Sequence, residues 1–341
     1  MKEVISTLRG DYSKEKFGAL ASIRQTALDG LREALKERGY TEVTVASLVN
    51  IAGSCENPHA SFSLNYYGRE AHLSQSAQLQ LEALVLRLRK GFFTVNNSFR
   101  EENYKDPEAG GRRLSEFTLV EPEKPYEGLF PEEALDKIVE EETTVMKHAT
   151  QKVLENNLED VELLGGDNEY LKNVVKEPFE RLTYEEALKL LNGKGGHHKF
   201  GDDLGVKEER AVLRHFDNIP TFVTHYPSSI KFFNMKRTPC GKKVYSVDLL
   251  MPKLGETVGG AVREENGKNI ERQFRESKIG EYLSAKKMDV AAPFAEYFAL
   301  FEQEAPLLRG GYGIGFERFV GFLIGSNDIL ETIAYRTLRP V

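Results

Sequence analysis

The chain has 341 residues with a formal net charge of −7, and 40% of its residues are hydrophobic. This length suits one large domain or two ordinary ones, and the acidic balance gives no electrostatic reason for broad affinity to nucleic acid or membranes. Cys55 and Cys240 are too far apart to make a disulfide framework, so we expect a reducing, cytoplasmic compartment. The sequence has neither an export signal nor an apolar run long enough to span a bilayer, so we expect no membrane contact.

The first predicted element is an amphipathic helix over residues 16 to 38. Its apolar residues recur at helical spacing, and Gly39 follows where a left-handed C-cap is common. Residues 1 to 15 are then an N-terminal extension. The β-branched run "YTEVTVASLV" predicts a strand directly after the helix, and further strands are expected around residues 61 to 66.

A long antiparallel hairpin is predicted next, because "GFFTVNNSF" and "FTLVEPE" are aromatic and β-branched runs of strand length. Residues 98 to 117 between them are densely charged and interrupted by proline and glycine. A solvated loop is the ordinary interpretation of such a stretch. The flanking strands favour another, in which arginines at the two bases of the hairpin converge and capture phosphate. The charged candidates are Arg100, Glu102, Arg112, Arg113 and Glu116.

A second long helix is predicted from Pro131 to about residue 158, with acidic residues in its first turn. Residues 192 to 205, "NGKGGHHKFGDDLG", form a flexible glycine-rich loop whose adjacent His197 and His198 lack metal-ligand spacing. The last third consists of strand-length runs separated by glycine-rich segments. Because strands come in hairpin-spaced runs, we predict one α+β domain over residues 1 to 341, with an antiparallel sheet flanked by helices.

Several stretches place charged residues where a sheet ordinarily holds apolar ones. Asp248 and Glu256 in "VDLLMPKLGE" are oxygen donors of the kind that Mg²⁺ takes alongside phosphate oxygens. Arg263 follows two glycines that permit close approach of a ligand. Glu317 and Arg318 lie near the end of "GGYGIGFERF", where a glycine-rich strand is expected to turn into a helix. No P-loop and no GxGxxG motif after a strand is present. Together these segments suggest a nucleoside triphosphate site of another kind.

These segments resemble the catalytic core of class II aminoacyl-tRNA synthetases, and within that class the asparaginyl enzymes. The hairpin is similar to motif 2, with Arg100 in the FRxE position and Arg112 and Glu116 in the RHxxEF position. "GGYGIGFERF" is similar to motif 3. "HLSQSAQLQLE", "FGDDLGVKEER", "FVTHYPSSIKFFNMK" and "VDLLMPKLGETVGGAVREE" follow the order and spacing of the family, so the resemblance covers roughly residues 17 to 325.

The resemblance implies binding of ATP with Mg²⁺ and of an amino acid. Arg100 and Arg318 would be catalytic, stabilising charge on the α-phosphate and holding the γ-phosphate, and Phe117 would stack on adenine. The implied ATP-binding residues are Arg100, Glu102, Arg112, Phe117, Glu256 and Arg318. The implied metal ligands are Asp248 and Glu256. The implied amino-acid-binding residues are Glu56 in "CENP", Ser76, Gln78, Glu82 and Arg263.

The side-chain specificity follows from the pair Leu81 and Glu82. Aspartate-activating relatives have a lysine at the position of Leu81, and a lysine favours a β-carboxylate. A carboxylate at Glu82 beside Arg263 instead favours a primary amide, whose NH₂ donates to Glu82 while its oxygen accepts from Arg263. The alternative for Glu56 and Glu82 is that both are exposed carboxylates without a ligand.

The chain also departs from the family pattern, and chiefly at positions that face the acceptor. Arg113 stands where the family has histidine, the hairpin loop is longer, and the chain starts almost at the catalytic helix, so we expect no anticodon-binding barrel. The other departures are Val45 for the motif 1 proline, which weakens the expectation of a homodimer, Ala261 for a serine, Asn234 for a tyrosine and Arg309 for the histidine before the motif 3 glycines.

The sequence thus predicts an ATP-dependent ligase that activates asparagine, or a close analogue, as an aminoacyl adenylate. Because acceptor-facing positions have changed, the expected acceptor is something other than an anticodon-selected tRNA, although tRNA recognised by its end remains open. One alternative is an aspartate-ammonia ligase that makes asparagine. Another is a non-catalytic sensor of amino acid or ATP, and a third is a conventional synthetase whose anticodon domain is a separate protein.

Overall fold

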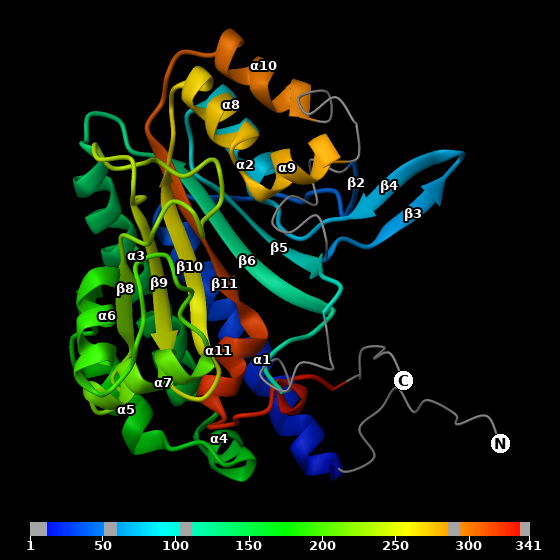
Figure 1. The fold of residues 1–341 in the computed structure, drawn as a ribbon. Coiled ribbons are helices and arrows are strands. Elements are labelled where there is room, and N and C mark those ends of the chain that lie inside the picture. Colours follow the sequence, from blue (N-terminus) through cyan, green and yellow to red (C-terminus); the bar gives the residue numbers. More distant parts are fainter. Residues whose placement is uncertain (1–11, 51–59, 103–110, 286–293, 335–341) are drawn as a thin grey trace, which may run out of the picture.

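The computed structural model describes residues 12–50, 60–102, 111–285 and 294–334 (Figure 1). Most of the predicted N-terminal extension, Glu56 with Cys55, and the tip of the predicted hairpin lie outside the described residues. The description of the fold and of the site therefore concerns the four ranges.

An eight-stranded sheet forms the centre of the molecule (Figure 1). Its order is β1 (Thr41–Glu42), β5 (Phe92–Phe99), β6 (Glu116–Pro125), β11 (Arg309–Gly315), β10 (Gly255–Arg263), β9 (Ser246–Met251), β8 (Thr221–Thr224) and β7 (Glu180–Thr183). From β5 to β8 every neighbouring pair is antiparallel, as predicted. The outermost pairs, β1 with β5 and β7 with β8, are parallel. Helices lie between the strands of each of these pairs along the chain, as parallel neighbours require.

The antiparallel ladder contains one irregularity that matters for the site. On β10, Glu256 lies opposite Leu250 and Val258 lies opposite Leu249, so Thr257 is an extra residue between them. This β-bulge is followed by regular pairing up to the end of the strand.

Two long helices, α1 (Lys14–Glu37) and α3 (Pro131–Asn156), cover one face of the sheet (Figure 1). Ser13 caps the start of α1 by accepting from the amide of Lys16. The two helices approach so closely at Gly30 that a Cβ there would lie 2.8 Å from the Cα of Ala149. The predicted second helix ends two residues earlier than expected, and α4 (Leu158–Leu164) follows after Asn157.

Two groups of helices stand at the ends of the other face (Figure 1). The first group is α2 (Gln78–Leu88), α8 (Gly267–Arg275), α9 (Lys278–Ala285) and α10 (Ala295–Gln303), which share an aromatic-rich core. The second group is α6 (Tyr184–Gly193) and α7 (Val206–His215), which share a smaller core with β8 and β9. The space between the two groups leaves the middle strands accessible from this side.

The remaining elements complete the domain. α5 (Asn168–Lys176), α11 (Phe316–Leu323) and the 3₁₀ helix Ile329–Thr332 pack at the lower end of Figure 1. A small sheet is formed by β2 (Leu48–Val49), β4 (Arg69–Leu73) and β3 (Ser63–Tyr66). The strand predicted over "YTEVTVASLV" is interrupted, since only β1 and β2 at its two ends are paired. Among the described helices, none is long and apolar enough to cross a membrane.

Candidate active site

A cavity of about 1070 Å³ lies over the middle of the sheet, between the two helix groups. Its lining gathers ten of the residues singled out from the sequence, contributed by segments that are far apart along the chain. These are Ser76, Gln78, Arg100, Glu102, Arg112, Phe117, Asp248, Glu256, Arg263 and Arg318. Glu82 lies behind the lining, and Glu56 is outside the described residues.

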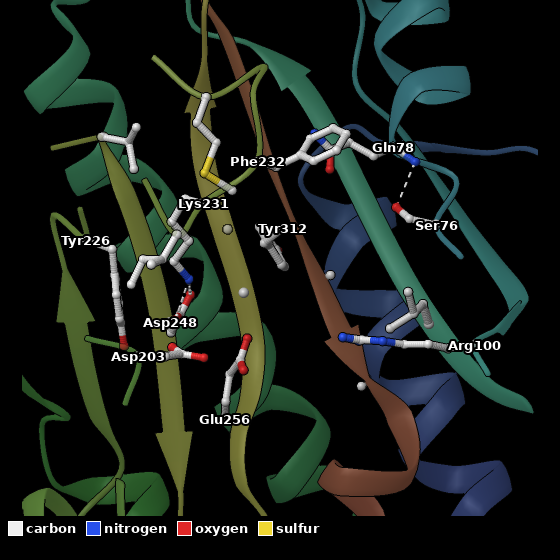
Figure 2. Close-up of a pocket in the computed structure, with 18 of the residues that line it drawn as sticks. Ser76, Gln78, Arg100, Asp203, Tyr226, Lys231, Phe232, Asp248, Glu256 and Tyr312 are labelled. Atoms are coloured by element: carbon white, nitrogen blue, oxygen red, sulfur yellow. Dashed lines mark hydrogen bonds and ion pairs between the residues drawn. The ribbon is translucent and has the colours of Figure 1, made fainter. Parts of the chain in front are cut away.

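Arg100 and Arg318 keep a part of their side chains accessible in this cavity. The side chain of Arg100 is 33% exposed, and its Nε lies 3.3 Å from Glu102, which also pairs with Arg113 at 3.2 Å. The side chain of Arg318 is 25% exposed and donates to the backbone carbonyl of Glu256. Figure 2 shows Arg100 pointing over the sheet toward the side on which Glu256 lies. Both cations are therefore placed to receive an anion.

Arg112, by contrast, is a buried residue that protein groups already hold. Its Nη2 donates to Glu209 at 2.5 Å, and its Nε donates to the backbone carbonyl of Leu254 at 2.9 Å. A Cβ at Gly255, where φ is +79°, would lie 1.9 Å from Glu209 and 2.1 Å from Arg112, so only glycine permits this arrangement. Sequence analysis gave Glu209 no role, although it lies in the quoted segment "FGDDLGVKEER".

Asp248 and Glu256 come together over Gly259. A Cβ at Gly259 would lie 3.0 Å from Glu256 Oε1 and 3.6 Å from Asp248 Oδ1, so the missing side chain leaves room between the carboxylates. Lys231, a residue without a predicted role, donates to both oxygens of Asp248 at 2.7 and 2.6 Å (Figure 2). Burial raises the pKa of Asp248 to about 7 against the opposing charge of Lys231.

These two carboxylates suit a Mg²⁺ ion that substrate phosphates also bind, rather than one that the protein binds alone. Within the described residues, no group of three or more histidines, cysteines and acids could hold a metal by itself. Mg²⁺ is commonly bound by one or two carboxylates together with substrate phosphates. The donor set of Asp248 and Glu256 meets that requirement once phosphate oxygens are present, and the ammonium of Lys231 balances the charge of Asp248 before then.

The start of α2 is fixed by a carboxylate that sequence analysis missed. Glu121 on β6 accepts from the hydroxyl of Ser76 at 2.5 Å and from the amide of Ala77 at 2.8 Å. The Ser76 oxygen in turn accepts from the backbone amide of Gln78 at 3.1 Å (Figure 2). Ser76 and Gln78 are thereby held at the cavity wall. Leu81, the residue before Glu82, also lines the cavity.

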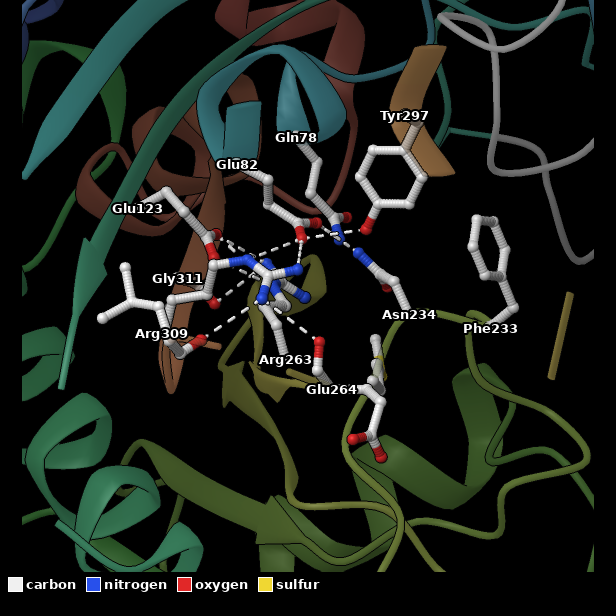
Figure 3. A network of polar contacts seen from close by, with 12 residues as sticks. Gln78, Glu82, Glu123, Phe233, Asn234, Arg263, Glu264, Tyr297, Arg309 and Gly311 are labelled. Atoms are coloured by element: carbon white, nitrogen blue, oxygen red, sulfur yellow. Dashed lines mark hydrogen bonds and ion pairs between the residues drawn. The ribbon is translucent and has the colours of Figure 1, made fainter. Parts of the chain in front are cut away.

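Glu82 was expected beside Arg263, but each of the two has a different ion-pair partner. Arg263 pairs with Glu123, to which its Nη2 donates at 3.0 Å, and Glu82 pairs with Arg309 (Figure 3). Burial lowers the pKa of Arg263, but the charges of Glu123 and then Glu82 raise it above its usual value, so Glu82 lies near this guanidinium. Burial raises the pKa of Glu123 to about 7 against the opposing charge of Arg263. Residues 82 and 309 belong to different segments, so sequence spacing gave no signal of their pairing.

Two departures from the family pattern, Arg309 and Asn234, meet at Glu82. Nε of Arg309 donates to Glu82 at 3.0 Å, the Asn234 amide donates to the other carboxylate oxygen, and Tyr297 on α10 donates its hydroxyl at 3.0 Å (Figure 3). The side chains of Glu82 and Arg309 are both fully buried. The side chains at positions 234 and 309 thus share one carboxylate partner.

Comparison with known proteins gives a consistent result. The family model described as tRNA synthetases class II (D, K and N) matches residues 8–339. The asparagine–tRNA ligases of Pyrococcus abyssi and Ureaplasma urealyticum are 32% and 31% identical to this chain over 95% and 94% of its length, which corresponds to 68% and 69% of theirs. The chain thus spans about two thirds of the length of these relatives.

Solved structures agree in fold. The asparaginyl-tRNA synthetase of Pyrococcus horikoshii, complexed with asparaginyl-adenylate, superposes with a TM-score of 0.82 at 32% identity, covering 95% of this chain and 70% of that one. An asparaginyl-tRNA synthetase of Entamoeba histolytica gives a TM-score of 0.75 at 25% identity, covering 95% and 68%. With its mixed sheet, its motif-bearing cavity and the match over nearly its whole length, this chain belongs to the class II tRNA synthetase family of the D, K and N type.

Proposed function

We propose that the protein uses ATP to activate asparagine, or a close analogue, as an aminoacyl adenylate with release of pyrophosphate. The observation that carries this proposal is the arrangement around one cavity. Arg100 and Arg318 remain accessible in it at what we take as the phosphate end, Asp248 and Glu256 lie together over Gly259, and Ser76 and Gln78 are held at the cavity wall. A triphosphate and a small amino acid fit such a cavity side by side.

In this proposal the substrate carboxylate attacks the α-phosphorus of ATP, forming a P–O bond while the bond to the pyrophosphate oxygen breaks. Arg100 stabilises the negative charge that develops on the α-phosphate, and Arg318 holds the leaving pyrophosphate. Mg²⁺, when bound by Asp248 and Glu256, would neutralise part of the negative charge of the phosphates. The protein side chains act by position and charge, and none of them is a nucleophile.

The finer part of the proposal is that the adenylate passes to an acceptor other than an anticodon-selected tRNA. It is supported by Arg113, which stands at the family's histidine position in the hairpin and is 46% exposed at its side chain. Radiolabelled amino acid would be offered with bulk tRNA, with ammonia and with hydroxylamine. Efficient charging of one anticodon-defined tRNA would overturn this part and leave the activation step in place.

The first experiment is amino-acid-dependent ATP–pyrophosphate exchange, without tRNA, over the set of natural amino acids. Exchange that depends on asparagine or a near relative of it would support the activation step. Silence with all of them, while calorimetry still detects binding of ATP and asparagine, would favour the sensor function instead. The control is a variant with Arg181→Ala, because Arg181 pairs with Asp136 and is not among the residues that line the cavity.

A further inference from the structure

Two arginines lie directly opposite each other on neighbouring strands, and one of them, Arg263, lines the part of the cavity proposed to take the amino-acid side chain, here called the side-chain end. Arg263 on β10 and Arg309 on β11 form the last register pair of the two strands. Like charges directly opposite each other in a sheet are destabilising. Each cation has its own carboxylate partner, Glu123 for Arg263 and Glu82 for Arg309 (Figure 3).

Glu82 has no acceptor capacity left for a ligand. A carboxylate offers about four lone-pair sites, and five donor contacts from four residues reach Glu82. The four residues are Gln78, Asn234, Tyr297 and Arg309, the last with two of its nitrogens. A substrate amide would have to displace one of these donors to reach the carboxylate.

Arg309 is equally committed to the protein. Its Nη1 donates to the carbonyls of Glu264 at 3.1 Å and Leu307 at 3.4 Å, and its guanidinium lies 5.1 Å from the centre of the Phe301 ring on α10. Since both members of the pair are fully buried, solvent screens their interaction little. Position 309 therefore cancels a negative charge that a neutral residue would leave uncompensated beside the cavity.

The groups that still face the cavity are suited to a carboxylate. Arg263 and Gln78 line it, and within the described part of the chain Nη1 of Arg263 has no hydrogen-bond acceptor. Both residues carry N–H donors. A β-carboxylate can accept from both of them, and the two carboxylates nearest to them, Glu123 and Glu82, each have an arginine partner.

We propose that Arg309 is a specificity-determining residue that switches off the discrimination of Glu82 against acids, so that the side-chain end accepts a β-carboxylate, that of aspartate, as well as a carboxamide. This inference rests on the proposed function, because it names the substrate class of the same cavity. Arg309 acts through Glu82 and touches no substrate, so it is a positioning residue.

The test measures kcat/KM for aspartate relative to asparagine in pyrophosphate exchange. We expect the two values to lie within about tenfold of each other in the unmodified protein. Arg309→Gln uncovers the charge of Glu82 and should lower the aspartate-to-asparagine ratio at least about tenfold, through the KM for aspartate rather than through kcat. Arg309→Lys keeps the positive charge, so its aspartate-to-asparagine ratio of kcat/KM should stay close to that of the unmodified protein.

The double variant Glu82→Gln, Arg309→Gln separates the two roles of Glu82 and protects the test if the single variant fails to fold. If Glu82 and Arg309 only cancel each other, removing both leaves the ratio within about threefold of its original value. If Glu82 instead binds the substrate amide directly, the double variant loses asparagine preferentially, and the inference is overturned. Rejection of aspartate by more than about 100-fold in the unmodified protein would overturn it as well.

Calorimetric titration of aspartate and asparagine into the same variants keeps this inference distinct from the proposed function. The binding ratio reports the charge balance at the side-chain end even when no adenylate forms. Absence of exchange with a binding ratio that shifts as expected would refute the activation step and support the role of Arg309. If the ratio of the affinities for aspartate and asparagine does not change with any substitution at residues 82 and 309, the role of Arg309 is refuted.

Discussion

The two ends of the cavity treat their charged residues in opposite ways. At the phosphate end, Arg100 and Arg318 are 33% and 25% exposed at their side chains, so they remain available. At the side-chain end, Glu82 and Arg309 are 0% exposed and occupied by one another. A charged residue at a family position can therefore serve a ligand or only the protein, and its partners decide which.

The largest expected effect lies at the phosphate end. Arg100→Ala or Arg318→Ala should lower kcat for pyrophosphate exchange by at least about 100-fold, because a cation aimed at developing phosphate charge is lost in a confined site. Thermal unfolding should change little, since both side chains are partly exposed. Arg181→Ala, which removes a surface ion pair with Asp136, should leave both quantities unchanged. An active Arg100→Ala protein would show that this arginine is not the α-phosphate ligand.

A smaller effect is expected where the phosphate end depends on a buried pair. Glu209→Gln removes the negative partner of Arg112, whose remaining anchor is the carbonyl of Leu254. We expect the KM for ATP to rise about tenfold with a lesser change in kcat, since charge-assisted hydrogen bonds position the arginine. The neighbouring Glu208→Gln is the matched control. An unchanged KM for ATP would mean that Arg112 only packs the hairpin.

The smallest expected effect concerns a buried carboxyl beneath the cavity, on the helix side of the sheet. Both oxygens of Glu142 on α3 lack a hydrogen-bond partner within the described structure, and a Cβ at Gly260 would lie 2.7 Å from one of them. Burial, followed by the charges of Asp248 and Glu141, raises the pKa of Glu142 well above 4.5. The folded protein therefore keeps a proton that the unfolded chain releases.

The sign of the pH dependence follows from that difference. Below pH 4.5 both states are protonated and Glu142 costs nothing, but above it the free energy of unfolding falls by up to about 1.4 kcal/mol per pH unit until the folded group ionises. Glu142→Gln removes this loss. The melting temperature of the variant minus that of the unmodified protein should therefore increase as the pH rises from 5 to 8. Glu140→Gln, an exposed neighbour on the same helix, should show no such gain. If the melting temperatures of Glu142→Gln and the unmodified protein change with pH by the same amount, the raised pKa of Glu142 is contradicted.

Sequence alone predicted the elements whose signals are local. The apolar spacing and capping of α1, the strand pair β5 and β6, and the turn from β11 into α11 at Arg318 all follow from neighbouring residues. The accessible members of the site were also predicted, because family motifs are contiguous. The parallel outer strands were missed, since β1 and β7 pair with strands that lie a helix or more away in the chain.

The pairings inside the site could not be predicted in the same way. Glu82 and Arg309 are separated by 227 residues, and Glu123 and Arg263 by 140. Glu82 has two arginines nearby, and only the packing of α2, α10 and β11 decides which of them it meets. Positions 234 and 309 were expected from the sequence to depart from the family pattern, and the fold was needed to show that both side chains contact the same carboxylate.

The bulge at Thr257 decides which chemistry β10 can offer. Side chains along a strand alternate between its faces, so residues 256 and 259 would ordinarily point to opposite sides. The extra residue reverses the parity, and Glu256 comes to share the cavity face with Gly259 and Arg263 while Val258 and Val262 join the core. One inserted residue thereby brings the carboxylate of Glu256 and the guanidinium of Arg263 onto one surface. A deletion at position 257 would keep both halves of the strand but place the side chains of Glu256 and Arg263 on opposite faces of the sheet.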